Sequence, residues 1–171
     1  DTTKYSYEFS PLGKELIFIG NMYSVQNMDA AVWFAENVLP VLRKLDSYKF
    51  KVIGRIKPSD FKMLNSIPGV TATGSVPDIS LAARGAVAGI CSVRLAAGVQ
   101  NKILEYMALG IPTITSSIGL EGLEAKIGHE ILVADSVVSY VEHITELDKN
   151  LCFAKLISEN AYSYVKRSHS W

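Results

Sequence analysis

Residues 93–113 read VRLAAGVQNKILEYMALGIPT, and the fold of the whole chain can be inferred outward from this stretch. It follows an apolar run from Val87 to Val93, passes a basic residue and a loop of small residues, and continues into a helix that Gly110 and Pro112 close. A strand, a loop and a helix in that order leave free N–H groups of the first helical turn at the carboxyl edge of a sheet. Because those groups and the helix dipole attract anions, the stretch predicts a phosphate site.

Lys102 and Glu105 make this prediction more specific. At about 100° per residue they fall on one helix face with Tyr106 and Leu109. The remaining large or apolar side chains turn to the opposite, core-facing side: Ile103, Leu104, Met107 and Ala108. A lysine there can neutralise a phosphate, and a carboxylate one turn deeper can accept hydrogen bonds from ribose hydroxyls. The alternative is a solvated ion pair worth about 0.2–0.5 kcal/mol.

Strands and helices alternate along the rest of the chain. We expect strands near residues 15–20, 49–53, 70–73, 87–93 and 131–134. We expect helices that start at Asn27 as N-cap, after Pro58, at Ile79 with Asp78 as its cap, at Asp135 or Ser136, and at Asn150. Pro40 should kink or end the first segment of its helix. This alternation predicts an α/β fold with a parallel, doubly wound, Rossmann-like sheet that binds ligands at the carboxyl ends of its strands.

Residues 97–112, AGVQNKILEYMALGIP, resemble the pattern E-G-x-x-x-x-x-x-E-A-M-A-x-G-x-P of the retaining family 4 (group 1) glycosyltransferases. Four further segments resemble that family: IFIGNM at 17–22, VIG at 52–54, GVTATGSVPD at 69–78 and GLEGL at 119–123. The resemblance covers nearly the whole chain. It implies one half of a GT-B architecture, the half that binds the sugar donor.

The resemblance assigns roles to several residues. It implies that Glu105 binds the donor ribose and that residues 98–102 lie against the donor diphosphate. Ala97 stands where the family has its first glutamate, which contacts the transferred sugar. Residues 1–14 are similar to an interdomain linker, and residues 15–171 to the nucleotide-sugar-binding domain. The N-terminal acceptor domain and the final crossover helix are then expected to lie outside this sequence.

The candidate substrate-binding set combines the helix opening with loops that follow strands. It comprises Glu105, Lys102, Arg94, Gly98, Val99, Gln100, Asn101, Gly20, Asn21, Gly54 and Val76. Arg94 and Lys102 are the candidate stabilisers of the diphosphate, and other catalytic groups are expected in the N-terminal domain. Arg94 could equally pair with a nearby carboxylate. The glycines could form turns or allow close approach of a ligand, and Arg55 could flank the base or ribose or lie at the surface.

Composition narrows the class of protein. The 171 residues carry 17 basic and 17 acidic side chains, which gives no general attraction to nucleic acid or to anionic lipid. No apolar run reaches the length of a membrane span, so membrane contact is expected only through the missing domain. Cys91 and Cys152 are expected to be core thiols in a reducing, cytoplasmic compartment. No Asp-x-Asp, dinucleotide fingerprint or P-loop occurs, so we expect no metal site and no cofactor.

The sequence therefore predicts the donor-binding domain of a hexosyltransferase-type glycosyltransferase that acts in polysaccharide, glycan or lipid precursor synthesis. Its partners would be a nucleoside diphosphate sugar and the N-terminal domain of the same protein. By itself the domain is expected to be inactive. Two alternatives remain: a non-enzymatic nucleotide-binding module, and a GT-B-like nucleotide-sugar epimerase. The base, the sugar and the acceptor are left open, as are the stereochemical outcome and the oligomeric state.

Overall fold

A computed structural model of the chain describes residues 5–95 and 98–169. Ala97, at the place of the family's first glutamate, lies outside the described residues, as do the two ends of the chain. The six strands are β1 (Glu15–Ile19), β2 (Lys49–Ile53), β3 (Val70–Ala72), β4 (Ala88–Cys91), β5 (Thr113–Thr115) and β6 (Leu132–Val133). They form one parallel sheet in the order β3-β2-β1-β4-β5-β6. The predicted parallel, doubly wound sheet is confirmed.

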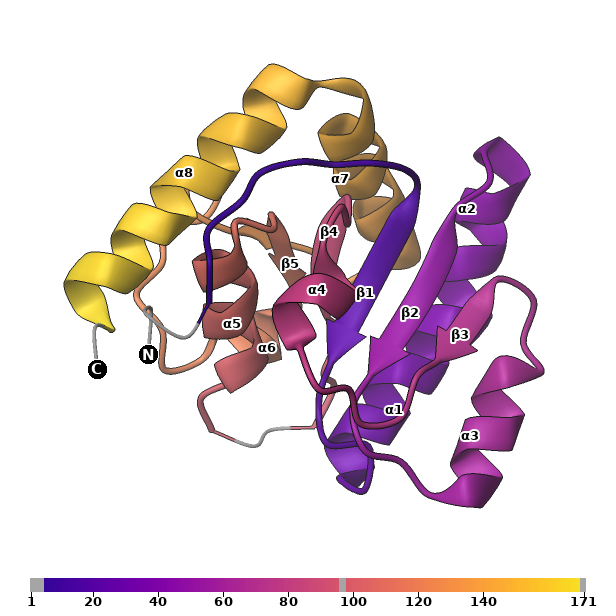
Figure 1. Cartoon of the computed structure of the whole chain (residues 1–171). Helices are drawn as coiled ribbons and strands as arrows, with labels where there is room; N and C mark the ends of the chain where they lie inside the picture. The colour runs from indigo at the N-terminus through magenta and orange to yellow at the C-terminus, as the bar shows by residue number, and fades with distance from the viewer. Residues whose placement is uncertain (1–4, 96–97, 170–171) are drawn as a thin grey trace.

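Helices cover both faces of this sheet (Figure 1). The first helical segment consists of α1 (Val25–Trp33), a π-helical turn η1 (Phe34–Val38) and α2 (Leu39–Leu45). The others are α3 (Pro58–Asn65), α4 (Ile79–Ala83), α5 (Asn101–Leu109), α6 (Ser117–Leu120), α7 (Val137–Lys149) and α8 (Leu151–Ser168). In Figure 1, α4 and α5 lie in front of the sheet, while α1, α2 and α7 lie behind it. No helix in the described residues is long and apolar enough to cross a membrane.

Strand β1 shows why both faces need helices. Leu16 and Phe18 point into the larger core with α1, η1, α2 and α7, whereas Ile17 and Ile19 point into a second cluster with Tyr106 of α5. Successive side chains of a strand face opposite sides of the sheet, so an uninterrupted apolar run needs both faces of the strand to be covered. The strand is therefore central, and its carboxyl end lies deep within the layered structure.

Helix boundaries differ from prediction at several points. The N-cap of α1 is Ser24, whose hydroxyl accepts a hydrogen bond from the Asn27 amide, so the prediction of Asn27 as cap is wrong. The predicted interruption at Pro40 is confirmed, because the α-helical ladder breaks into η1 just before it. Asp78 caps α4 as predicted, and of the two candidates for α7 it is Ser136 that caps.

Two other expectations also need correction. The GLEGL segment at 119–123, which the family resemblance implies is a turn, has its first two residues in the last positions of the one-turn helix α6. Cys91 is buried as expected, while Cys152 is exposed on α8 and is not a core thiol. Within 5–14 there is no helix or strand, as expected, yet this segment is anchored: the Glu8 amide donates to Leu109 O (3.1 Å) and the Tyr7 hydroxyl hydrogen-bonds Ser158 (3.0 Å).

Candidate nucleotide site

Two adjoining pockets open at the carboxyl edge of the sheet. The apolar pocket has a volume of about 280 Å³ and is lined by Ile19, Gly20, Asn21, Ile53, Gly54, Arg55, Ser75, Val76, Ile79 and Glu105. The polar pocket, of about 290 Å³, is lined by Ile19, Gly20, Asn21, Ser24, Gln26, Asn27, Val99, Gln100, Asn101, Lys102 and Glu105. Both pockets share residues 19–21 and Glu105. Glu105 therefore stands at the junction between a cavity suited to an apolar ring and one suited to a polar group.

The polar pocket lies between the starts of two nine-residue helices. Ser24, Gln26 and Asn27 bring the amino end of α1 to it, and Gln100 and Asn101 bring that of α5. The first turn of each helix has N–H groups without an intrahelical partner, and each helix dipole is positive at this end. Two such ends facing one cavity favour an anionic ligand.

Lys102 supplies a full positive charge to this pocket. Its ammonium donates to Asn27 Oδ1 at 2.8 Å and to Gln100 Oε1 at 3.4 Å, and it lies 5.0 Å from the centroid of the Phe18 ring. The side chain is only 7% exposed. Burial lowers the pKa of Lys102 from its usual value, and the nearby Cys91 and Glu105 partly oppose that shift. An anion in the pocket would replace the hydration that the buried ammonium has lost.

Sequence reasoning missed Asn27 as a site residue. Its side chain accepts the hydrogen bond from Lys102 and donates from Nδ2 to Asn21 O at 3.0 Å. A Cβ on Gly20 would lie 2.8 Å from Asn27 Nδ2, so this amide sits where only glycine leaves room. Asn27 thus joins the β1–α1 loop to the lysine of α5. From the sequence alone, this asparagine is interpreted as a helix cap.

Gly20 and Gly54 form the wall of the apolar pocket. A Cβ on Gly54 would lie 1.7 Å from Gly20 O, and Gly54 has a φ of +147° and a bridge to Gly74. The short distance from the added Cβ and the positive φ angle each require glycine at position 54. Arg55, beside it, lines the pocket with its guanidinium 4.3 Å from the centroid of the Tyr23 ring. The predicted Val76 contributes an apolar side of the same pocket.

The predicted set is brought together at these pockets with two exceptions, Gly98 and Arg94. Gly98 turns the chain with a φ of +76° and lines neither pocket. Arg94 pairs with a carboxylate, the alternative left open above: its Nε and Nη2 donate to Asp29 Oδ2 (3.0 Å) and Oδ1 (2.7 Å). Its guanidinium lies 5.8 Å from the centroid of the Trp33 ring. The structure therefore places Lys102, and not Arg94, in the polar pocket with Glu105.

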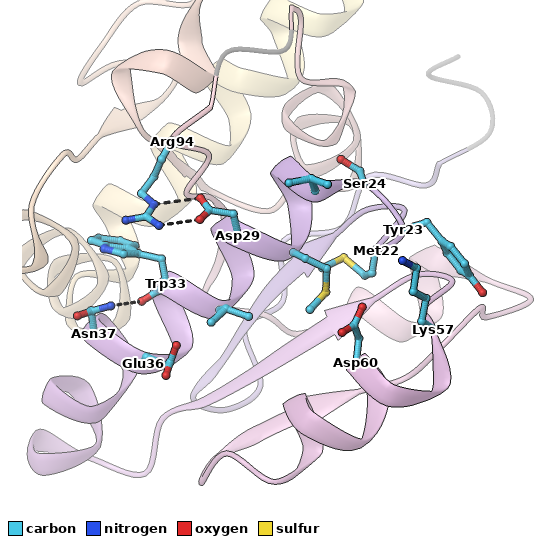
Figure 2. A pocket seen from close by; sticks show the side chains of 13 residues that line it. Met22, Tyr23, Ser24, Asp29, Trp33, Glu36, Asn37, Lys57, Asp60 and Arg94 are labelled. Atoms are coloured by element: carbon cyan, nitrogen blue, oxygen red, sulfur yellow. Dashed lines mark hydrogen bonds and ion pairs between the residues drawn. The ribbon is translucent and has the colours of Figure 1, made fainter.

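Arg94 belongs to a third cavity, of about 710 Å³, on the outer side of α1 (Figure 2). We call it the α1 groove; besides Arg94 it is lined by Met22, Tyr23, Ser24, Val25, Met28, Asp29, Val32, Trp33, Glu36, Asn37, Lys57 and Asp60. Figure 2 shows Arg94 and Asp29 facing each other at one side of it and Lys57 and Asp60 at the other. Its three acidic and two basic side chains give it no preference for an anion, although it is larger than either pocket at Glu105.

The described residues contain no group of three or more His, Cys, Asp or Glu side chains that could hold a metal ion. The residues that line the two pockets offer hydrogen bonding, fixed positive charge and apolar contact. Together these can bind a ligand that carries a ring, a diol and a diphosphate in sequence.

Comparisons with known proteins bear on the family and the fold of the chain. Residues 13–150 match the family described as glycosyl transferases group 1. An uncharacterized 44.6 kDa protein in the cps region of Klebsiella pneumoniae is 25% identical over an alignment of 164 residues, and the alignment covers 90% of this chain and 42% of that protein. The chain thus spans less than half the length of this relative.

Two solved structures show the same fold at low sequence identity. One is the C-terminal domain of the glycosyl transferase group 1 family protein LpcC from Francisella tularensis, with a TM-score of 0.75 and 17% identity, covering 98% of this chain and 97% of that one. The other is Anabaena HepE in complex with UDP and glucose, with a TM-score of 0.70 and 11% identity, covering 91% of this chain and 44% of that one.

Proposed function

This chain belongs to the glycosyl transferases group 1 family, and on that premise we propose that it binds the nucleoside diphosphate sugar donor of a glycosyltransferase. The observation that carries the proposal is the meeting of the apolar and polar pockets at Glu105. A nucleotide requires a site for the base, one for the ribose and one for the phosphates, in that order. The HepE structure, which contains UDP and glucose, supports this choice of ligand class.

In this proposal the base enters the apolar pocket, and the ribose hydroxyls donate to the half-buried carboxylate of Glu105. The diphosphate then lies in the polar pocket beside Lys102 and the amino ends of α1 and α5. A unit charge about 4 Å from a phosphate contributes roughly 4 kcal/mol before desolvation at an effective dielectric constant near 20. A helix dipole contributes about 0.3–1 kcal/mol. The lysine therefore dominates the binding of the diphosphate.

The same groups would assist transfer of the sugar. Negative charge builds on the diphosphate as the bond to the sugar breaks, and fixed N–H donors with the Lys102 ammonium stabilise it without reorganisation. The acceptor and any base would come from an N-terminal domain of the same protein. The free thiols Cys91 and Cys152 are compatible with a reducing, cytoplasmic setting for the reaction.

Calorimetric titration of the chain with UDP, GDP and dTDP tests donor binding. A thermodynamic cycle that combines one substitution with one altered ligand tests the geometry of the bound nucleotide. Charge-assisted hydrogen bonds contribute about 1.5–3 kcal/mol, so Glu105→Gln should weaken UDP binding about tenfold or more. Against 2′,3′-dideoxy-UDP the same substitution should change affinity by less than about twofold, because no hydroxyl is left to lose. Glu159→Gln, an exposed carboxylate on α8, is the matched control. Equal losses with both ligands would contradict the ribose assignment.

Activity itself is tested on the complete protein with a labelled nucleotide sugar. Incorporation of label into an acceptor supports a transferase. Nucleotide binding without turnover would support a binding module instead, and turnover without any acceptor would support an epimerase.

A further inference from the structure

The two central strands β1 and β4 separate at the edge where the ligand pockets open. They are neighbours in the sheet, yet their register consists of Leu16 with Ala88 and Ile17 with Gly89. Chain order reverses between these strands, which is the place where open α/β sheets bind ligands. Past Ile17, the facing backbone groups of β1 and β4 therefore need another partner.

The hydroxyl of Tyr106 takes that place. It accepts a hydrogen bond from the Ile19 amide at 2.9 Å and donates to Ile90 O at 2.8 Å, so it spans the two strands just beyond their last pair. The ring reaches this point from α5 across the face of β4. A Cβ on Gly89 would lie 2.4 Å from Tyr106 Cγ, so the phenol fits only over a glycine.

This link is fixed by burial. Tyr106 is fully buried, and burial raises the pKa of its hydroxyl well above the usual value. The phenol therefore keeps its proton across the physiological pH range and always has one hydrogen to donate to Ile90 O. The hydrogen-bonded bridge between β1 and β4 therefore lies within the core of the fold.

We propose that Tyr106 is a positioning residue for the nucleotide site: it holds the wall formed by residues 19–21 at a set distance from Glu105. That wall lines both the apolar and the polar pocket, and Tyr106 fixes its first residue through the Ile19 amide. Glu105 is the neighbour of Tyr106 on α5, so the hydroxyl ties this wall to the helix that carries Glu105. This role rests on the proposed donor-binding function.

The test compares two buried tyrosines. Tyr106→Phe keeps the ring and removes the hydroxyl, and it should weaken UDP binding about fivefold or more, since small displacements of a binding wall are costly. Tyr48→Phe is the matched control: the Tyr48 hydroxyl donates to Asp148 Oδ2 at 2.7 Å, and Tyr48 lies just before β2, at the amino edge of the sheet. Both changes should lower the melting temperature, but Tyr48→Phe should leave UDP affinity within about twofold.

Coupling to Glu105 separates a positioning role from a merely structural one. In a Glu105→Gln background, Tyr106→Phe should cost clearly less UDP affinity than in the unaltered chain. The reason is that the carboxylate, from which Tyr106 keeps the wall at a set distance, is gone. Equal losses in the two backgrounds, or normal UDP affinity of Tyr106→Phe at a temperature where it is folded, would overturn the role of Tyr106. Failure of the unaltered chain to bind any nucleoside diphosphate would instead contradict the proposed function.

A measurement without substitution covers the case in which Tyr106→Phe does not fold. Amide hydrogen exchange of the unaltered chain should show the Ile19 amide protected to the same degree as the central amides of β1. Exchange of the Ile19 amide much faster than that of the central amides of β1 would show that the hydroxyl does not hold this wall, and would overturn the proposal.

Discussion

Asn27 Oδ1 accepts a 2.8 Å hydrogen bond from Lys102 Nζ, and this contact joins the start of α1 to the start of α5. The two residues are 75 positions apart in the chain. The same side chain donates to Asn21 O at 3.0 Å. The asparagine therefore fixes both the cation of the polar pocket and the loop that faces it, and the predictions below follow from this arrangement.

Asn27→Ala should weaken UDP binding about tenfold or more, because a hydrogen bond to a charged group contributes about 1.5–3 kcal/mol. Asn37→Ala is the matched control. Asn37 donates to Trp33 O at 2.9 Å within its own helical segment and lines the α1 groove, so its loss should not change UDP affinity. Calorimetry of both variants decides the matter, and equal affinities of the two would refute this role of Asn27.

Lys102→Met should discriminate between ligands with and without phosphate. We expect UDP affinity to fall about ten- to a hundredfold, the equivalent of about 1.5–3 kcal/mol for a charge-assisted contact, while uridine affinity stays within about twofold. Lys155→Met, at an exposed position of α8, serves as control. A comparable loss of uridine binding would mean that the lysine supports the pocket's shape and not the phosphate.

The pH dependence of UDP binding should also report on Lys102. Its folded-state pKa lies below the ordinary 10.5, so on raising the pH the ammonium is lost, and UDP affinity falls, at lower pH than an unperturbed lysine would give. Stability changes in the opposite direction. Between the folded-state pKa and 10.5 the unfolded chain binds more protons, so the free energy of unfolding rises with pH through that window. Both slopes, taken as differences from Lys102→Met, should vanish if Lys102 is not their source.

Much of the fold could be predicted because β1 and β4 are short, mostly apolar runs bounded by turn residues, and β2 alternates polar and apolar residues as a strand does. Which faces of helix α5 are buried could not be predicted. Tyr106 and Leu109 were placed with Lys102 on a face opposite the core, but both are buried. Helix α5 packs against the sheet on one side and against α8 on the other, so little of it faces solvent. A helical period identifies faces but does not say how many neighbours cover them.

The candidate site, like the fold, could be predicted only where local sequence patterns determine the position of a residue. Residues that follow strands, such as Gly20, Gly54 and Val76, had to gather at one sheet edge, and they do. Arg94 also follows a strand, but its guanidinium forms an ion pair with Asp29 on helix α1. Pairings such as Asn27 with Lys102 or Tyr106 with Ile19 depend on the distance between elements far apart in sequence, which no local pattern contains.

The central claim is that one nucleotide lies across both pockets at Glu105, and backbone amide NMR tests it most directly. Titration of the chain with UDP should shift the amides of residues 19–21, 54–55, 75–76 and 99–102, on both sides of Glu105. The NMR signal of the indole N–H of Trp33, in the α1 groove, should not shift. Shifts gathered around Trp33, Asp29 and Arg94, with silence at residues 19–21 and 99–102, would contradict the account.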